Sequence, residues 1–236
     1  MFKSVASFAF VSCLAVSAFV AASPTKAQDY GPHRWTGVYI GAHGGWASST
    51  VDYANTGTPE QDLSGAILGL QLGAQYQFSG GVVAGIEADV SFAKLNDTVR
   101  DGNYITESGQ ISSIGTVRGR LGYAMGAFLP YVTAGLAWDR LKQGEVCPAP
   151  AAAPFGFCNT HGPFDLSETK TNTGFVWGGG LEYAINQKWS IKAEGLWTDL
   201  GSTNYTLCCD AGDKPLPASI ADHDIKMFRI GANLHF

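Results

Sequence analysis

The stretch TVRGRLGY, Thr116 to Tyr123, places two arginines two positions apart in a run that otherwise has the composition of a β-strand. Side chains of a strand alternate between its two faces, so Arg118 and Arg120 share one face. The opposite face carries Val117, Leu121 and Tyr123, with glycine between them. The surroundings of this strand must therefore be apolar on one side and able to accept two cations on the other.

The same alternation recurs along the chain. Its clearest form is residues 65–78, where Ala66, Leu68, Leu70 and Leu72 alternate with glycine, isoleucine and glutamine. Reading by parity predicts eight strands, within residues 37–46, 65–78, 82–92, 116–123, 132–138, 174–185, 189–197 and 228–236.

Three features favour a membrane barrel over a soluble one. The connections SGG, MGAFLP and NQK are short, whereas those around Asp52, Asp101, Ala151 and Asp210 are long, as in outer-membrane barrels with short periplasmic turns. The face opposite the apolar one is polar or glycine throughout the predicted strands. Aromatic residues of the apolar face gather at the two strand ends, at Tyr76, Phe78, Tyr123, Tyr183, Trp189 and Phe236 on the short-turn side and at Trp46, Phe92, Trp138, Trp177, Trp197 and Phe228 on the other.

These features predict an all-β protein, an eight-stranded antiparallel up-and-down transmembrane β-barrel in the bacterial outer membrane. A cleaved signal peptide precedes it, since Lys3 is followed by an apolar run and then by SPTKAQ. Cleavage follows Ala22 or Ala27. We favour Ala27, which gives a signal peptide at 1–27 and a barrel domain at 28–236; a retained membrane anchor is the weaker reading.

Composition limits the partners. The chain has 236 residues, of which 15% are charged, and a net charge of −5, which gives no support for nucleic-acid binding. A barrel of this kind has membrane lipid as its surroundings and presents its long loops to ligands outside the cell.

Eight predicted inward charges balance, because four are acidic and four are basic: Glu87, Asp89, Glu182 and Glu194 against Arg118, Arg120, Lys192 and Arg229. Buried charges persist when they are paired, and the interior of an eight-stranded barrel is just wide enough for side chains to fill. We therefore favour a charge network that plugs the lumen over a proton or ion path.

Several stretches resemble the small outer-membrane β-barrel proteins of alphaproteobacteria, the outer-membrane immunogenic or opacity-type porin-like family. The matching pieces are WTGVYIGAHGGW, GTVRGRLGYA, LPYVTAGLAW, GFVWGGGLEYAI, WSIKAEGLWTDLG and FRIGANLHF. The resemblance implies an OmpA-like eight-stranded barrel and roles in envelope integrity and host interaction; some relatives bind haemin. It also implies that the terminal strand carries a signal for the outer-membrane assembly machinery, at Phe228, Ile230, Ala232, Leu234 and Phe236.

Loss of the signal peptide would remove Cys13 and leave four cysteines in an oxidising compartment: Cys147, Cys158, Cys208 and Cys209. Four cysteines allow three pairings. We favour Cys147–Cys158, which closes a short loop rich in proline and alanine, and leaves the adjacent pair either bonded to each other or free.

Candidate chemistry is sparse, so we predict no enzyme and no cofactor. The motif DHD at 222–224 is a lone acid–histidine motif and fits a polar strand mouth better than a protease site. A metal site at Cys208, Cys209, Asp210 and His223 lacks the usual ligand spacing. Haemin would use His161 or His223 on extracellular loops. Two function classes remain open: a structural and surface-interaction barrel, or a narrow porin or haemin-binding surface protein.

Overall fold

The computed structural model describes residues 34–54, 61–100, 106–148, 158, 163–209 and 215–236, and describes side chains over slightly fewer positions. The predicted signal peptide at 1–27 lies outside these residues. Residues 32–236 form one compact unit. No helix among the described residues is long and apolar enough to cross a membrane.

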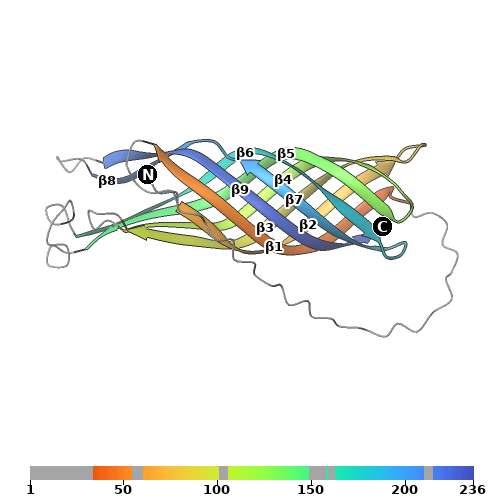
Figure 1. Ribbon diagram of the computed structural model, residues 1–236, viewed down its shortest axis with the longest axis horizontal. Helices are drawn as coiled ribbons and strands as arrows, with labels where there is room; N and C mark the ends of the chain where they lie inside the picture. The colour runs from red at the N-terminus through yellow and green to blue at the C-terminus, as the bar shows by residue number, and fades with distance from the viewer. Residues whose placement is uncertain (1–33, 55–60, 101–105, 149–157, 159–162, 210–214) are drawn as a thin grey trace, which may run out of the picture. The chain divides into compact units, whose positions relative to one another are not determined.

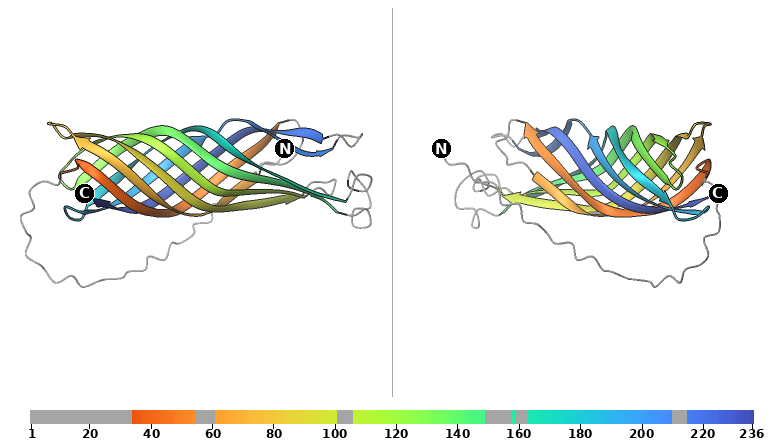
Figure 2. Two further views of the ribbon diagram at one scale, coloured as in Figure 1. Left: turned by 180° about the vertical axis from the view of Figure 1, so that it is seen from behind. Right: turned by 45° about the vertical axis from the view of Figure 1, so that its right-hand side comes forward.

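Antiparallel strands make up the unit and wrap round a common axis (Figures 1 and 2). Each strand pairs with its neighbour in the sequence as far as β7, and the last strand pairs with both β7 and β1. The strands are β1 (Gly37–Ala54), β2 (Gln61–Gln77), β3 (Val82–Arg100), β4 (Thr106–Tyr123), β5 (Phe128–Cys147), β6 (Phe164–Ala184), β7 (Trp189–Asp199), β8 (Thr203–Cys209) and β9 (Pro215–His235).

Eight positions close the barrel although nine strands are described. β7 and β8 occupy one position in turn, because β7 pairs with β9 up to Asp199 and β8 pairs with it from Thr203 onward. Gly201 lies in the break between them with a φ of 65°, a conformation that favours glycine. The predicted eight-stranded antiparallel barrel is confirmed, and the interruption of its seventh position is a feature that the alternation did not reveal.

The strands are longer than predicted at one end. The three short connections predicted from SGG, MGAFLP and NQK join β2 to β3, β4 to β5 and β6 to β7 at one end, the short-turn end. At the opposite, long-loop end the strands extend into the predicted loops, so that Asp52 lies inside β1. The barrel wall therefore continues past the level at which the sequence alone would end it.

The outer wall of the barrel is an apolar belt. Leu68, Leu72 and Phe175 expose between 62% and 70% of their surface, and all the aromatic residues predicted for the two strand ends are exposed as well. In β5 the two ends, at Phe128 and Trp138, are separated by the number of residues that a strand needs to cross a bilayer, about 9–11. We call the parts of the strands between these two aromatic rings the membrane-spanning segments.

Beyond the aromatic ring at the long-loop end the two faces exchange character. Apolar side chains fill the interior here, mostly outside the predicted strands; within those strands the prediction of a polar or glycine inner face is wrong at Ile67, Ala137, Val176 and Leu196. The full set is Ala47, Val51, Leu63, Ile67, Leu95, Ile111, Ile114, Ala137, Leu141, Val176, Leu196, Leu200, Ile225 and Met227. We call this set the long-loop core. Past the membrane the wall faces water, so the apolar surface that stabilises the barrel has to lie inside it.

A second apolar layer closes the short-turn end. Trp35 precedes β1 and buries its ring completely against Val83, Leu129 and Ala184. Its indole Nε1 donates to the carbonyl oxygen of Gly126 at 3.4 Å. We call these four residues the short-turn seal. The interior is thus layered, with apolar side chains at both ends and polar ones between them.

Candidate functional site

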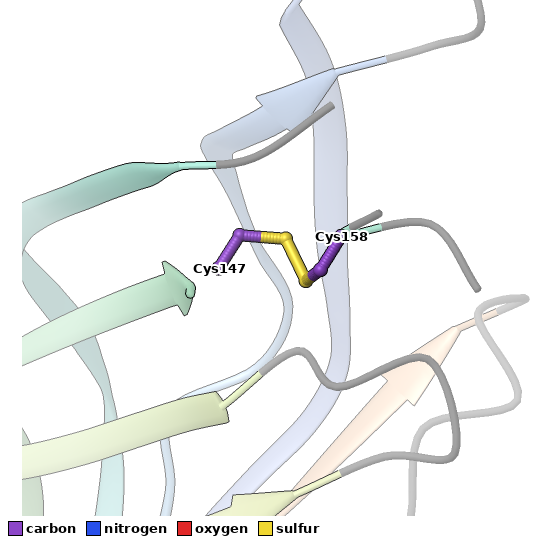
Figure 3. The surroundings of a disulfide bond; sticks show 2 residues. All are labelled: Cys147 and Cys158. Carbon is purple, nitrogen blue, oxygen red and sulfur yellow. A yellow bond between two sulfur atoms is a disulfide. The ribbon is translucent and has the colours of Figure 1, made fainter. Parts of the chain in front are cut away.

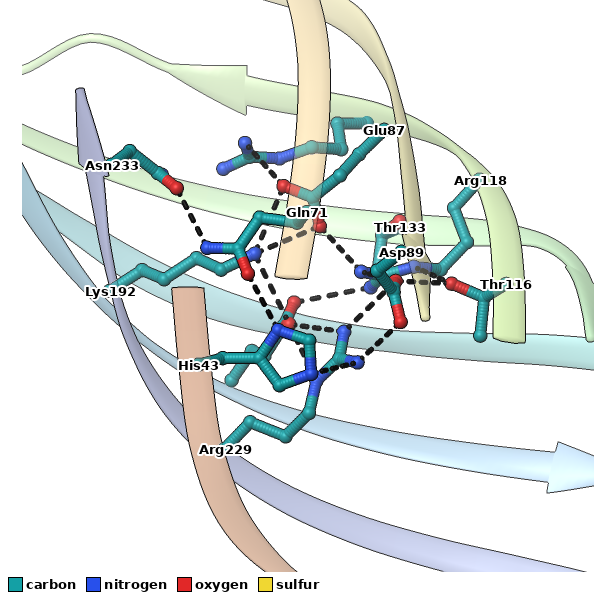
Figure 4. A network of polar contacts seen from close by, with 12 residues as sticks. His43, Gln71, Glu87, Asp89, Thr116, Arg118, Thr133, Lys192, Arg229 and Asn233 are labelled. Carbon is teal, nitrogen blue, oxygen red and sulfur yellow. Dashed lines mark hydrogen bonds and ion pairs between the residues drawn. The ribbon is translucent and has the colours of Figure 1, made fainter. Parts of the chain in front are cut away.

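The eight predicted lumen charges all point into the barrel between the two apolar layers, and all are buried. Five strands supply them, and Figure 4 shows Glu87, Asp89, Arg118, Lys192 and Arg229 turned toward one another. Their positions are Glu87 and Asp89 on β3, Arg118 and Arg120 on β4, Glu182 on β6, Lys192 and Glu194 on β7, and Arg229 on β9.

Arg118 is the centre of the network and is 1% exposed. Its guanidinium contacts Glu87 at 2.5 Å, Asp89 at 3.0 Å and Glu194 at 3.1 Å. Glu87 is its direct partner in the β3–β4 register, whereas Glu194 reaches it from β7 across the lumen. Its Nε donates to the hydroxyl of Thr116 at 2.9 Å. One side chain therefore joins three carboxylates from two walls.

Arg120 extends the network toward the short-turn end. Its guanidinium contacts Glu182 at 2.7 Å and Glu87 at 3.3 Å, and donates to the hydroxyl oxygen of Tyr39 at 2.6 Å. That hydroxyl donates in turn to Glu87 at 2.8 Å. The ring of Tyr131 lies 4.0 Å below the guanidinium, at the distance of a cation–π contact.

The remaining two cations close the charge balance. Arg229 contacts Asp89 at 2.7 Å and Glu194 at 2.5 Å. Lys192 contacts Glu87 at 2.8 Å and Glu194 at 3.3 Å. Every carboxylate of the network therefore contacts at least one cation, and three of the four contact two or more.

Neutral polar side chains complete the network, and the sequence pattern did not indicate that they belong to it. His43 lies 2.6 Å from Gln71 and 2.7 Å from Ser91. Gln71 donates to Asn233 at 2.8 Å, and Asn233 donates to Glu182 at 2.7 Å. The alternation in the sequence places these residues on the inner face of their strands, but it does not identify which side chains they contact.

Glycines of β2 provide the room that the long polar side chains need. A Cβ added at Gly73 would lie 2.3 Å from the ring of Tyr39, and one at Gly69 would lie 2.5 Å from His43 Nε2. Larger residues at these two positions would displace rings that bond the network. The glycine positions of the alternating pattern thus have a packing cause.

A smaller polar cluster lies inside the long-loop core, beyond the membrane-spanning segments. His223 Nε2 lies 3.6 Å from Asp139 Oδ2, and Asn172 donates to Asp139 Oδ1 at 2.9 Å. Burial raises the pKa of Asp139 to about 7 and lowers the pKa of His223 to about 4. The expectation that His223 lies on an extracellular loop is wrong: it lies within β9 and is 2% exposed.

The cysteine prediction is confirmed for one pair. Cys147, at the end of β5, is bonded to Cys158, with the two Cα atoms 5.4 Å apart (Figure 3). The side chains of Cys208 and Cys209 lie outside what the structure describes, as do His161 and Asp210. Among the described residues, no group of three or more His, Cys, Asp and Glu side chains is arranged to hold a metal ion.

The residues of the predicted assembly signal follow one face of β9. Phe228, Ile230 and Phe236 point outward and are exposed, and Ala232 and Leu234 are half-buried on the same face. The backbone N–H of Phe236 donates to the carbonyl oxygen of Val38 at 2.9 Å, so the last residue is fixed against β1.

A closed antiparallel barrel with an apolar outer belt, two aromatic rings and a charged interior defines an outer-membrane β-barrel protein. Comparison with known proteins agrees: residues 6–236 match the model of the outer membrane protein β-barrel domain, and the chain belongs to this family. Its place is the outer membrane.

The relatives are outer-membrane proteins. The 31 kDa outer-membrane immunogenic protein of Brucella melitensis is 29% identical over 94% of this chain and 93% of its own length. The 22 kDa outer membrane protein of Rhizobium leguminosarum is 30% identical over 73% of this chain and 68% of its own. Among solved structures, the outer membrane protein OprG of Pseudomonas aeruginosa is 17% identical with a TM-score of 0.49, over 87% of this chain and 99% of its own.

Proposed function

We propose that the protein is a structural and surface-interaction barrel with a closed, charge-plugged lumen, which supports the integrity of the envelope and displays its loops to the outside. One observation carries the proposal, the layered interior. A network of eight mutually paired charges lies between the long-loop core and the short-turn seal.

The energetics of the network support a structural role. A buried charge without a partner costs several kcal/mol, and charges that serve as a transport path need water or a mobile ion beside them. Here the four carboxylates form ion pairs with the four cations, and they also accept hydrogen bonds from the hydroxyls of Thr116 and Tyr39 and from the amide of Asn233. The network is therefore satisfied by the protein itself.

The proposal includes the partners expected from the sequence. Membrane lipid covers the apolar belt, the assembly machinery recognises the outward residues of β9, and ligands at the cell surface bind the long loops. It includes no catalytic activity: His223 of the DHD motif is buried, and the nearest carboxylate among those described is that of Asp139.

The alternatives are a narrow porin and a haemin-binding surface protein. A porin needs a continuous polar path, and the two apolar layers lie across that path. Haemin capture needs an accessible axial ligand, and His223 is not accessible. His161 remains the expected ligand for that alternative.

Conductance across a planar bilayer tests the closed lumen. We expect the native, folded protein to be silent. A second sample, with Arg118→Ala and Arg120→Ala, removes the largest side chains that block the bore. A leak in this variant identifies the charges as the barrier, and silence assigns the barrier to the apolar layers. A stable anion-selective current from the native protein would contradict the proposal, because charged rings select ions in open pores.

A deletion strain tests the role in the envelope. We expect it to become more sensitive to detergents and large antibiotics, and to recover when the full-length gene is returned. A strain that binds haemin less but keeps its envelope barrier would favour the haemin alternative instead.

A further inference from the structure

A cluster of basic side chains lies on the outer wall immediately past the aromatic ring at the long-loop end. Lys94 of β3 and Arg140 and Lys142 of β5 are all exposed there. Lys94 and Arg140 each lie two residues past a ring aromatic, Phe92 and Trp138 respectively. We call these three cations the basic patch.

The register brings the patch together across β4. Ser113 of β4 pairs with Phe92 on one side and with Arg140 on the other, and Lys142 pairs with Gln110. Strands lie about 4.8 Å apart, so cations on β3 and β5 are separated by about 10 Å at their backbones. Side chains as long as lysine and arginine can converge over the strand between them.

Among the side chains that the structure describes, no acidic one is an exposed neighbour of the patch on its own face. Its exposed neighbours are uncharged: Asn96, Gln110, Ser112, Thr169 and Thr171. Asp139 points inward and is buried. Asp97 is two residues from the inward-facing Leu95 and therefore lies on the inner face of β3. Glu145 and Asp165 lie farther along the β5–β6 hairpin. Glu168 pairs with Gln143, one position past Lys142, and contacts Lys170 at 3.3 Å. Among the described side chains, none of the three cations forms an ion pair.

The opposite wall does not share this arrangement. Lys226 of β9 is exposed at the corresponding level, but Asp199 of β7 is its diagonal neighbour in the β7–β9 register and is also exposed. Basic residues that merely anchor a barrel at the interface would be found all round it. The uncompensated cations are concentrated over β3–β5.

An apolar groove lies in the outer wall over β4–β6, on the membrane side of Arg140. It has a volume of 390 Å³ and is lined by Val117, Leu136, Trp138, Thr173 and Phe175, among others. Trp138 is two residues from Arg140 and belongs to the groove, so the charged and apolar surfaces are continuous. This is the profile of an amphipathic ligand, with an anionic group at the level of the headgroups and a hydrocarbon chain below it.

We propose that the basic patch and this groove form a binding site for a lipid of the outer leaflet that carries phosphate in an anionic headgroup. Arg140 binds the phosphate oxygens with its forked donors, and Lys94 and Lys142 supply further charge. One acyl chain lies in the groove beside Trp138. The long-loop end faces outward in barrels of this kind, which places the site in the outer leaflet.

Native mass spectrometry of the full, folded chain in detergent tests the site. The probes are phosphatidylglycerol and phosphatidylcholine with identical acyl chains, so that only the headgroup differs. We expect the protein to prefer phosphatidylglycerol by about tenfold or more, since each cation near a headgroup contributes about fivefold. The variant K94Q/R140Q/K142Q should lose this preference, whereas the matched control K226Q should keep it.

Two further arms separate the groove and the source of the phosphate. Thr173→Trp fills the groove without changing charge and should weaken both lipids equally. Inorganic phosphate at millimolar concentration should not displace phosphatidylglycerol. The proposal is overturned if the triple variant keeps its headgroup preference, if K226Q loses it to the same extent, if Thr173→Trp leaves both affinities unchanged, or if inorganic phosphate competes.

Discussion

Replacement of Arg118 by methionine is the most direct test of the lumen network. Methionine keeps the unbranched stem of the side chain and removes its charged head. The change breaks ion pairs to Glu87, Asp89 and Glu194, all with fully buried partners. The network would hold four carboxylates and three cations, a net charge of −1 among buried side chains.

The expected cost follows from this imbalance. Removing one partner of a buried ion pair typically costs about 3–5 kcal/mol, because the other partner stays buried without its charge compensated. The double variant Arg118→Met with Glu194→Gln leaves three carboxylates and three cations. We therefore expect it to recover about 1–3 kcal/mol relative to the sum of the two single changes.

Reversible urea unfolding in phospholipid vesicles, followed by tryptophan fluorescence, measures these free energies. Lys226→Met, which removes an exposed cation from the outer wall, is the control and should stay within about 0.5 kcal/mol of the native protein. The reasoning fails if Arg118→Met is as stable as this control, or if the double variant is no more stable than additivity requires.

Three further predictions concern the ends of the barrel. Replacing Cys147 and Cys158 by serine should lower stability by at most about 3 kcal/mol and speed proteolysis between them, since the bond closes a short loop; peptide maps joining Cys147 to another cysteine would contradict the pairing. Deleting Phe236 should reduce the heat-modifiable, folded fraction seen on gels without reducing export, and an unchanged fraction would count against its assembly role. In the variant Asp139→Asn, the free energy of unfolding should rise between about pH 4 and about pH 6.5, because over this range the unfolded chain binds a proton at His223 that the folded chain does not. In the variant His223→Gln, the free energy of unfolding should fall between about pH 4 and about pH 7, because over this range the folded chain holds a proton on Asp139 that the unfolded chain releases. Slopes of the same sign in the two variants would refute this.

The outer wall was predictable from the sequence because lipid acts on it uniformly. Every outward residue between the aromatic rings meets the same apolar surroundings, so alternation at Leu68, Leu70 and Leu72 is a reliable signal. The inward charges were predictable for the same reason, as the parity of Arg118 and Arg120 follows directly from it. Which carboxylate each arginine contacts depends on strand stagger and could not be derived.

The parts that escaped prediction lie where the surroundings change. Beyond the membrane the apolar face moves inside, so residues such as Leu63 and Leu141 do not follow the pattern of the belt. Trp35 precedes the first strand and has no periodic context, although it closes the short-turn end. The break at Gly201 interrupts a strand within a single barrel position. Where the surroundings of a strand or its direction change within a few residues, the sequence shows no regular alternation of polar and apolar residues from which the change could be predicted.

The distribution of the network over the strands has a consequence for biogenesis. Asp89 is carried by β3 and Glu194 by β7, but Arg229, which neutralises both, arrives on β9, the last strand to leave the ribosome. An open sheet lacking β9 would carry four carboxylates and three cations, and hydrocarbon strongly excludes the uncompensated charge. We therefore expect closure of β1 against β9 to accompany insertion into the bilayer, and half-formed barrels to be retained at the membrane surface.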